Sequence, residues 1–399
     1  MGLLGHEMRK IWNPVVCTAI LVLGILYYYL FCSFYVSHFN NGPYEQAQFD
    51  LAVDWAENYG TTIEPEEFAG LENQREQYRD AISQDLRSDE FFASAGITDW
   101  DGFADWSSSL ESEDTQRPEA RQALRRVLMN KNYNAVLYLN SFIECYQNAE
   151  QRFALHALDK KEDKSDIFLN DAKERYEQIR VSSARYGYLP SGMMWSTLQY
   201  FKHLTVWSIL SVFLLISPVL VRDRLHRMRE TLWVSRKGRR LFHLQLTAAS
   251  LSAAMLTMLN ITAYAVPFLM QNTLIFKDFS LFSVYSFTFP WTDWTYGTYL
   301  LVLCGMVFLM SLAACGLAVF LSQFSGQYVS MLLKALPVYV CLRYLCAEIL
   351  MEVPFFRYYR PLVSLATPPC YEWCVIAVLS VVSILLQTIS CLRIQRLNI

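Results

Sequence analysis

The chain alternates long apolar stretches with charged connecting segments, and the apolar stretches are long enough to cross a bilayer. A membrane-spanning helix needs about 20 mostly apolar residues. Six stretches meet this length: 15–37, 203–221, 244–270, 296–321, 328–350 and 373–392. No small-residue cleavage site follows the first stretch, so we interpret it as a retained anchor rather than a secretory signal. The pattern predicts an all-α polytopic membrane protein with six transmembrane helices.

The segment 38–202, between the first two apolar stretches, differs from the rest of the chain in charge. Residues 41–190 hold 29 Asp or Glu and 16 Lys or Arg, a net charge of −13, whereas the remainder holds 8 acids and 18 bases, a net charge of +10. The overall net charge of −3 therefore combines an acidic domain with a basic membrane body. We predict an acidic, mainly helical domain over 38–202.

Within this domain, Pro and acidic residues mark the expected helix starts. Pro65 and the acids after it predict a helix to Arg87, and Pro118 opens a longer one whose apolar residues repeat at helical spacing to Ile143. A third helix is expected from Ser165-Asp166 towards Ala184. A loop is expected between the first two helices, at Trp100, Trp106 and Ser107–Ser109.

Basic residues in the short connecting segments set the expected orientation. Arg222–Arg240 holds eight Arg or Lys against two acids, and such loops stay on the cytosolic side of a membrane. This places both termini inside, with segments 1–14, 222–243, 322–327 and 393–399, and places 38–202 outside. The domain division is then 1–14 as a cytosolic amphipathic segment, 15–37 as the first span, 38–202 outside, and 203–399 as five further spans.

The chain lacks the common catalytic and ligand motifs. It contains no GxxxxGK[ST] phosphate loop, no HExxH, no GxSxG and no paired-cysteine zinc pattern, and its six His are scattered. We expect no catalytic residue, no metal site and no cofactor in this chain, and no nucleic-acid partner.

Several landmarks together resemble the ABC type-2 transporter permeases, the membrane halves of many bacterial exporters. Residues 3–12, LLGHEMRKIW, resemble the usual start of that family, a short amphipathic segment that includes Glu7 and Lys10. The acidic Asp223 after the second span, the segment 235–240 (SRKGRR) before the third span, and the Ser-containing turn at 321–326 also resemble the family. The resemblance covers about 235 residues of the membrane body.

The chain also departs from the family pattern at identifiable positions. The Lys expected a few residues into the third span is Gln245 here. The Glu-x-x-x-Gly-Thr pattern is replaced by Asp223 and by Arg229-Glu230-Thr231, and the domain between the first two spans is far larger than in the simplest members.

The resemblance implies a dimeric exporter of the bacterial cell membrane. A second permease copy or paralogue would form the dimer, and an ABC ATPase subunit beneath each half would bind ATP and Mg. The loop at 222–243 would contain the coupling helix that docks into the ATPase. The residues implied in this docking are Arg227, Arg229, Glu230, Trp233, Arg236, Lys237, Arg239 and Arg240. The alternative for the same bases is that they only enforce topology and contact anionic lipid headgroups.

Three charged residues interrupt the apolar stretch at 328–350. Ionisable groups at such positions usually face a protein interior or a cavity. Lys334 lies near the inner end and can extend its ammonium to the membrane surface. Arg343 and Glu348 are five residues apart, a spacing that is poor for pairing on one α-helix, so we expect them to pair with another span or with a dimer mate.

These observations leave two functions from different classes. The first is export of an amphipathic cargo through the lipid bilayer, an antimicrobial peptide or a lipid-like molecule, driven by ATP hydrolysis on a separate subunit. The alternative is a non-transporting, membrane-anchored receptor whose acidic domain binds a ligand or a partner protein.

Overall fold

The computed structural model describes residues 3–109, 118–148, 169–225, 238–284, 290–352, 355–356, 359–360, 365–366 and 368–396. At some positions within these ranges, 238–241 among them, only the backbone is described.

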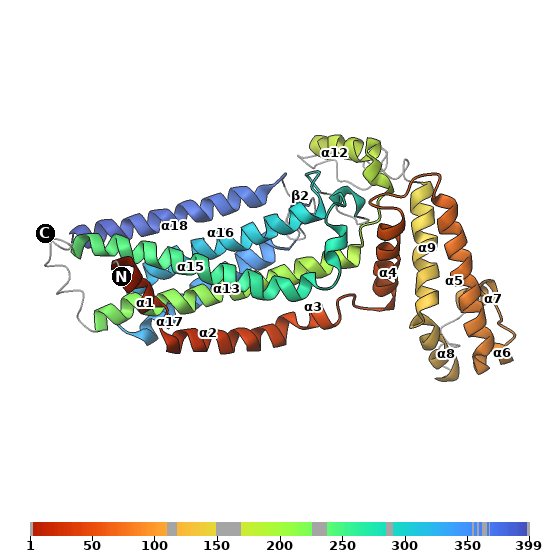
Figure 1. The fold of residues 1–399 in the computed structure, drawn as a ribbon, viewed down its shortest axis with the longest axis horizontal. Coiled ribbons are helices and arrows are strands. Elements are labelled where there is room, and N and C mark those ends of the chain that lie inside the picture. Colours follow the sequence, from red (N-terminus) through yellow and green to blue (C-terminus); the bar gives the residue numbers. More distant parts are fainter. Residues whose placement is uncertain are drawn as a thin grey trace.

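Six long helices form a bundle, and each is long and apolar enough to cross a membrane (Figure 1). Among the described residues, the only strands are two residues each, so the prediction of an all-α polytopic membrane protein is confirmed. The six are α2 (Pro14–Tyr27, continued by the π-helix η1, Tyr28–Cys32), α13 (Ser191–Leu225), α15 (Gly238–Leu269), α16 (Tyr296–Gln323), α17 (Tyr328–Arg343, continued by the π-helix η6, Tyr344–Leu350) and α18 (Tyr371–Arg396).

Helices α13 and α16 form the centre of the bundle. They pack against each other, α13 also contacts α2, α15 and α17, and α16 also contacts α15 and α18. Both central helices bury most of their side chains, whereas α2, α17 and α18 expose most of theirs. Because the exposed side chains of these outer helices are largely apolar, the outer surface of the bundle suits contact with lipid.

The connecting segments divide between the two ends of the bundle (Figure 1). One end carries both chain termini, the short helix α1 (Leu3–Ile11), and the end of α13 and the start of α15; we call it the terminal end. The opposite end, the domain end, carries the acidic segment and the small elements α3 (Phe34–Ser37), η4 (Thr273–Phe276), η5 (Leu281–Ser283), β1 (Tyr359–Arg360) and β2 (Leu365–Ala366). The two strands pair antiparallel.

The acidic segment is a helical domain, as predicted. Helices α4, α5 and α9 lie side by side, across the direction of the bundle (Figure 1). The helices are α4 (Pro43–Asn58), α5 (Phe68–Ser88), α6 (Glu90–Ser94), α7 (Trp100–Ser109), α8 (Pro118–Leu128), α9 (Lys131–Gln147), α12 (Leu169–Val181) and the 3-10 helix η3 (Ser183–Tyr186).

Two expectations inside this domain are wrong in detail. The segment around Trp100 and Trp106 is helix α7 rather than a loop, because Trp100 and Phe103 turn one face into an aromatic core. The single helix expected from Pro118 is two helices, because the side chain of Asn130 accepts hydrogen bonds from the amides of Asn132 and Tyr133 and so begins α9. The expected cap at Ser165-Asp166 lies outside the described residues.

Helices α4 to α9 of the domain contribute to two hydrophobic cores, and only one of the two belongs to the domain alone. The far lobe buries Phe92, Phe103 and Val127 among their neighbours from α5 to α9. In the near lobe, Trp55 of α4 stacks on Tyr138 and packs edge-on against Tyr188, and these side chains belong to the same core as the membrane bundle. The near lobe is therefore built onto the bundle.

Replacing Asn130 with Ala is expected to destabilise the junction between α8 and α9. The change removes the α9 cap and the hydrogen bond to Asp85 Oδ2 at 2.8 Å, a loss of about 1–2 kcal/mol. Hydrogen exchange measured on peptides of α8 and α9 in the full chain should show faster exchange by about tenfold. The control is Asn148→Ala at the other end of α9. The side-chain amide of Asn148 donates to the carbonyl of Glu144, and its removal should leave exchange around Asn130 unchanged.

Two polar residues of α13 are separated by about the thickness of the hydrocarbon core of a bilayer. Asp223 lies at the terminal end, and Lys202 lies 21 residues earlier, which corresponds to about 31 Å along an α-helix. The hydrocarbon core of a bilayer is about 30 Å thick.

Candidate functional site: a polar junction at the terminal end

Four polar side chains from three helices meet at the terminal end of the bundle. Glu7 and Lys10 come from α1, Asp223 from the last turn of α13, and Gln245 from the second turn of α15. We call these four residues the polar junction. Glu7 and Asp223 are buried, with 3% and 8% of their surface exposed, which is rare for carboxylates unless they are paired.

Contacts made by its last residues hold α1 against the bundle. Its apolar face contributes Ile11 to the core, and the indole Nε1 of Trp12 donates to Ser252 Oγ on α15 at 3.1 Å. The chain then turns into α2, where Asn13 accepts from the amide of Val15 and Pro14 occupies the first helical turn. Helix α1 is thus held at its C-terminal end, and it packs mainly on α15 and also on α13.

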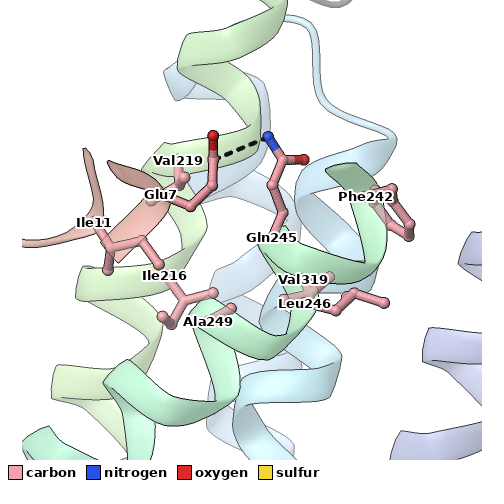
Figure 2. A pocket seen from close by; sticks show the side chains of 9 residues that line it. All are labelled: Glu7, Ile11, Ile216, Val219, Phe242, Gln245, Leu246, Ala249 and Val319. Atoms are coloured by element: carbon pink, nitrogen blue, oxygen red, sulfur yellow. Dashed lines mark hydrogen bonds between the residues drawn. The ribbon is translucent and has the colours of Figure 1, made fainter. Parts of the chain in front are cut away.

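Hydrogen bonds and ion pairs join the four residues into one network. Lys10 Nζ donates to Glu7 Oε1 at 2.8 Å and lies 3.9 Å from Asp223 Oδ1. Gln245 Nε2 donates to Glu7 Oε2 at 3.2 Å, as Figure 2 shows, and to Asp223 Oδ2 at 2.9 Å. An ionised carboxylate only accepts, so the two hydrogens of one amide nitrogen serve one carboxylate each.

The network carries more negative than positive charge. Two carboxylates face one ammonium, so with both acids ionised the junction has a net charge of −1. The Lys that the family pattern expects at position 245 would balance this charge. Gln245 instead supplies donors without charge, and Arg222, next to Asp223 on α13, is exposed.

A small cavity lies directly beneath the junction. Its volume is about 20 Å³, close to the space of one water molecule. Glu7 and Gln245 form its polar edge, and apolar side chains of α1, α13, α15 and α16 close the rest (Figure 2): Ile11, Ile216, Val219, Phe242, Leu246, Ala249 and Val319. The junction is therefore sealed from the bundle core by packed apolar side chains.

The residues predicted to dock the ATPase are next to this junction in sequence. Arg227, Arg229, Glu230, Trp233, Arg236 and Lys237 lie outside the described residues. Arg239 and Arg240 lie in the first turn of α15, where only the backbone is described. The segment 226–237 leaves α13 three residues after Asp223 and enters α15 eight residues before Gln245. A movement of that segment would therefore be transmitted first to the end of α13 and the start of α15, which the polar junction connects.

Two charges of the fifth span, Arg343 and Glu348, belong to a second group near the domain end. Glu348 has a partner on another span, as expected, whereas the pairing of Arg343 with Glu348 was not expected. Arg343 and Glu348 pair with each other, Nη2 to Oε1 at 3.5 Å, although they are five residues apart. The reason is the π-helix η6, whose i to i+5 hydrogen bonding brings residues five apart onto one face. Glu348 also pairs with Lys202 of α13. We call Lys202, Arg343 and Glu348 the charge cluster.

The sequence pattern did not indicate a role for Lys202, because it placed this residue in the outer domain. Helix α13 begins at Ser191, so residues 191–202 continue the second span without a break. The remaining charge, Lys334, is exposed, and its Nζ donates to the carbonyl of Phe324 at the C-terminal end of α16, 2.8 Å away. This agrees with the expected reach toward the near membrane surface.

Comparisons with family models, with curated proteins and with solved structures found no match to this chain.

Proposed function

We propose that this chain is the permease subunit of an ABC exporter, coupling ATP hydrolysis by a separate subunit to outward transport of an amphipathic molecule. The observation that carries the proposal is the polar junction. It joins three of the four segments in which the family resemblance was found, namely the opening helix, the end of the second span and the start of the third. A network of this kind makes the helix ends on both sides of segment 226–237 move as one unit.

The physical consequence is mechanical coupling between segment 226–237 and the helix bundle. Docking energy at segment 226–237, released or altered by the ATPase, would reach α13 and α15 through their joined ends. Because α13 is the central helix of the bundle and contacts α2, α15, α16 and α17, a shift of its end repacks every neighbouring span. The proposed ligand of the complex is ATP with Mg, bound by the ATPase and not by this chain.

The proposed location is the bacterial cell membrane, with both termini and segment 226–237 in the cytosol. The eight bases of Arg222–Arg240 support this orientation. The helical domain would then lie outside the cell, in a position to receive the cargo or hand it on. A dimer with a second copy or a paralogue completes the proposed transporter.

The test is purification of the full chain in mild detergent from its native host, with copurifying proteins identified and ATPase activity measured. The variant replaces Arg227, Arg229, Arg236 and Lys237 with Gln, which leaves four bases in the loop to maintain topology. Each charge-assisted hydrogen bond contributes about 1.5–3 kcal/mol, so recovery of the ATPase should fall at least about tenfold.

The matched control neutralises four exposed bases elsewhere, Arg87, Arg121, Arg125 and Lys277, and should retain the ATPase. Retention of a stoichiometric ATPase by the loop variant would contradict the docking assignment. An inactive chain without any ATPase, in several detergents, would contradict the exporter and favour an anchored receptor. Because the near lobe shares its core with the bundle, ligand binding by such a receptor would be measured on the full chain.

A further inference from the structure

The charge cluster lies where a bilayer has its phosphates. Lys202 is about 31 Å along α13 from Asp223, and Glu348 is about 30 Å along its helix from Tyr328 at the opposite boundary. Both distances match the thickness of the hydrocarbon core. The cluster is therefore at headgroup level, at the domain end of the bundle.

The cluster has an excess of positive charge and of hydrogen-bond donors. Two cations share one carboxylate, which gives a net charge of +1. Lys202 is mostly enclosed, whereas the side chain of Arg343 is 49% exposed. A guanidinium has five N–H donors and accepts nothing, so one contact at 3.5 Å leaves most of its donor capacity directed at the surroundings.

Side chains around the cluster are those of a membrane interface. Tyr344, next to Arg343, is exposed, and His203, next to Lys202, has its ring within 6 Å of the rings of Phe31 and Tyr35. Aromatic rings of this kind are enriched at headgroup level.

An apolar groove lies beside α13 and α17, between the cluster and the terminal end. Its volume is about 380 Å³, and it begins within one turn of Arg343, at Tyr339, and continues to Tyr328 and Pro218. Its lining is almost entirely apolar, from Leu210, Phe213 and Leu214 on α13 and from Met331, Leu332 and Leu336 on α17. A molecule with an anionic head at the cluster and a hydrocarbon chain in the groove satisfies both surfaces.

We propose that the charge cluster and this groove together bind one anionic phospholipid, with its phosphate on Arg343 and Lys202 and an acyl chain between α13 and α17. Glu348 orients the two cations and excludes a second anion. The phosphodiester of a lipid such as phosphatidylglycerol carries the single negative charge that the cluster lacks. A zwitterionic lipid of the same chain length brings no net charge and binds more weakly. This inference does not depend on the exporter function.

The experiment is native mass spectrometry of the purified full chain, titrated with phosphatidylglycerol and phosphatidylcholine of identical acyl chains. The wild type should retain one phosphatidylglycerol with at least about tenfold preference, given the two cations of the charge cluster. Arg343→Gln should remove the preference, and Arg343→Lys should preserve most of it. Lys334→Gln, an exposed cation on the same helix, is the control and should retain the full preference.

Two further measurements distinguish the contribution of the lipid headgroup from that of the acyl chain. Leu214→Trp, which fills the groove, should weaken both lipids by a similar factor, and inorganic phosphate at millimolar concentration should not displace bound lipid. Equal retention of the two lipids by the wild type, or an unchanged preference in Arg343→Gln, would overturn the proposal. Complete displacement by inorganic phosphate would overturn the placement of the acyl chain in the groove.

Discussion

Replacing Gly316 with Val is expected to separate α16 from α18 and to reduce the amount of folded protein more than the other single substitutions proposed for this chain. A Cβ at position 316 would lie 1.9 Å from Ser383 Oγ, 2.7 Å from Gln387 Nε2 and 3.1 Å from Ser383 Cβ. The hydroxyl of Ser383 can rotate away, but its Cβ is fixed by the backbone of α18. Overpacking of this kind costs about 1–3 kcal/mol for small additions, and the two γ-methyls of Val add further contacts.

The measurement is the melting temperature and the monodisperse fraction of the full chain in detergent. The matched control is Gly305→Val, eleven residues earlier on the same helix, where a Cβ would meet nothing within 4 Å. The two variants change helix propensity and apolar surface equally, so a difference between them reports the close approach of α16 to α18. Equal stability of the two variants would show that α16 and α18 approach each other less closely at Gly316 than they do in the structure.

Replacing Gln245 with Leu is expected to produce the second largest effect, through the polar junction. The change removes the two hydrogen bonds from Nε2 to Glu7 and Asp223 and leaves two buried carboxylates sharing Lys10. Leaving a buried acceptor without its donor costs about 1–3 kcal/mol, and Lys10 still compensates part of the negative charge. Gln245→Lys should instead raise stability, because it brings the net charge of the junction from −1 to 0.

A double-mutant cycle tests the mechanism directly. Glu7→Gln removes one charge and keeps the shape, so Glu7→Gln combined with Gln245→Leu should be less destabilised than the sum of the two single changes, with a coupling of about 1–3 kcal/mol. Thr247→Val, on the exposed face of the same helix, is the control and should show no coupling with Glu7→Gln. Strict additivity of Glu7→Gln and Gln245→Leu would mean that the hydrogen bond between them contributes nothing.

The length and periodicity of the apolar stretches were sufficient to predict the membrane body. Spanning helices satisfy their own backbone hydrogen bonds, so a local property, a run of about 20 apolar residues, predicts each one. The same reasoning placed Glu7, Lys10, Asp223 and Gln245 in three separate segments without indicating that they touch. Their meeting depends on α1 folding back onto α15, a contact between residues 238 positions apart.

The charge cluster could not be predicted for two local reasons. Pairing of Arg343 with Glu348 requires a π-helix, and a π-helix differs from an α-helix in that its backbone hydrogen bonds span five residues rather than four, which composition does not specify. Lys202 belongs to α13 because the helix continues to Ser191, beyond the apolar stretch that marks the span. The acidic side chains of the preceding segment gave no sign of that continuation.

The class of this protein, six spanning helices and a mainly helical acidic domain, follows from local sequence, because bilayer thickness and helix periodicity act on neighbouring residues. Which helix ends meet depends on tertiary packing. The polar junction, the charge cluster and the core shared by the near lobe and the bundle all join residues far apart in the chain. Such contacts depend on the packing of whole helices, at positions such as Gly316, where a single methyl group would change the approach of two spans.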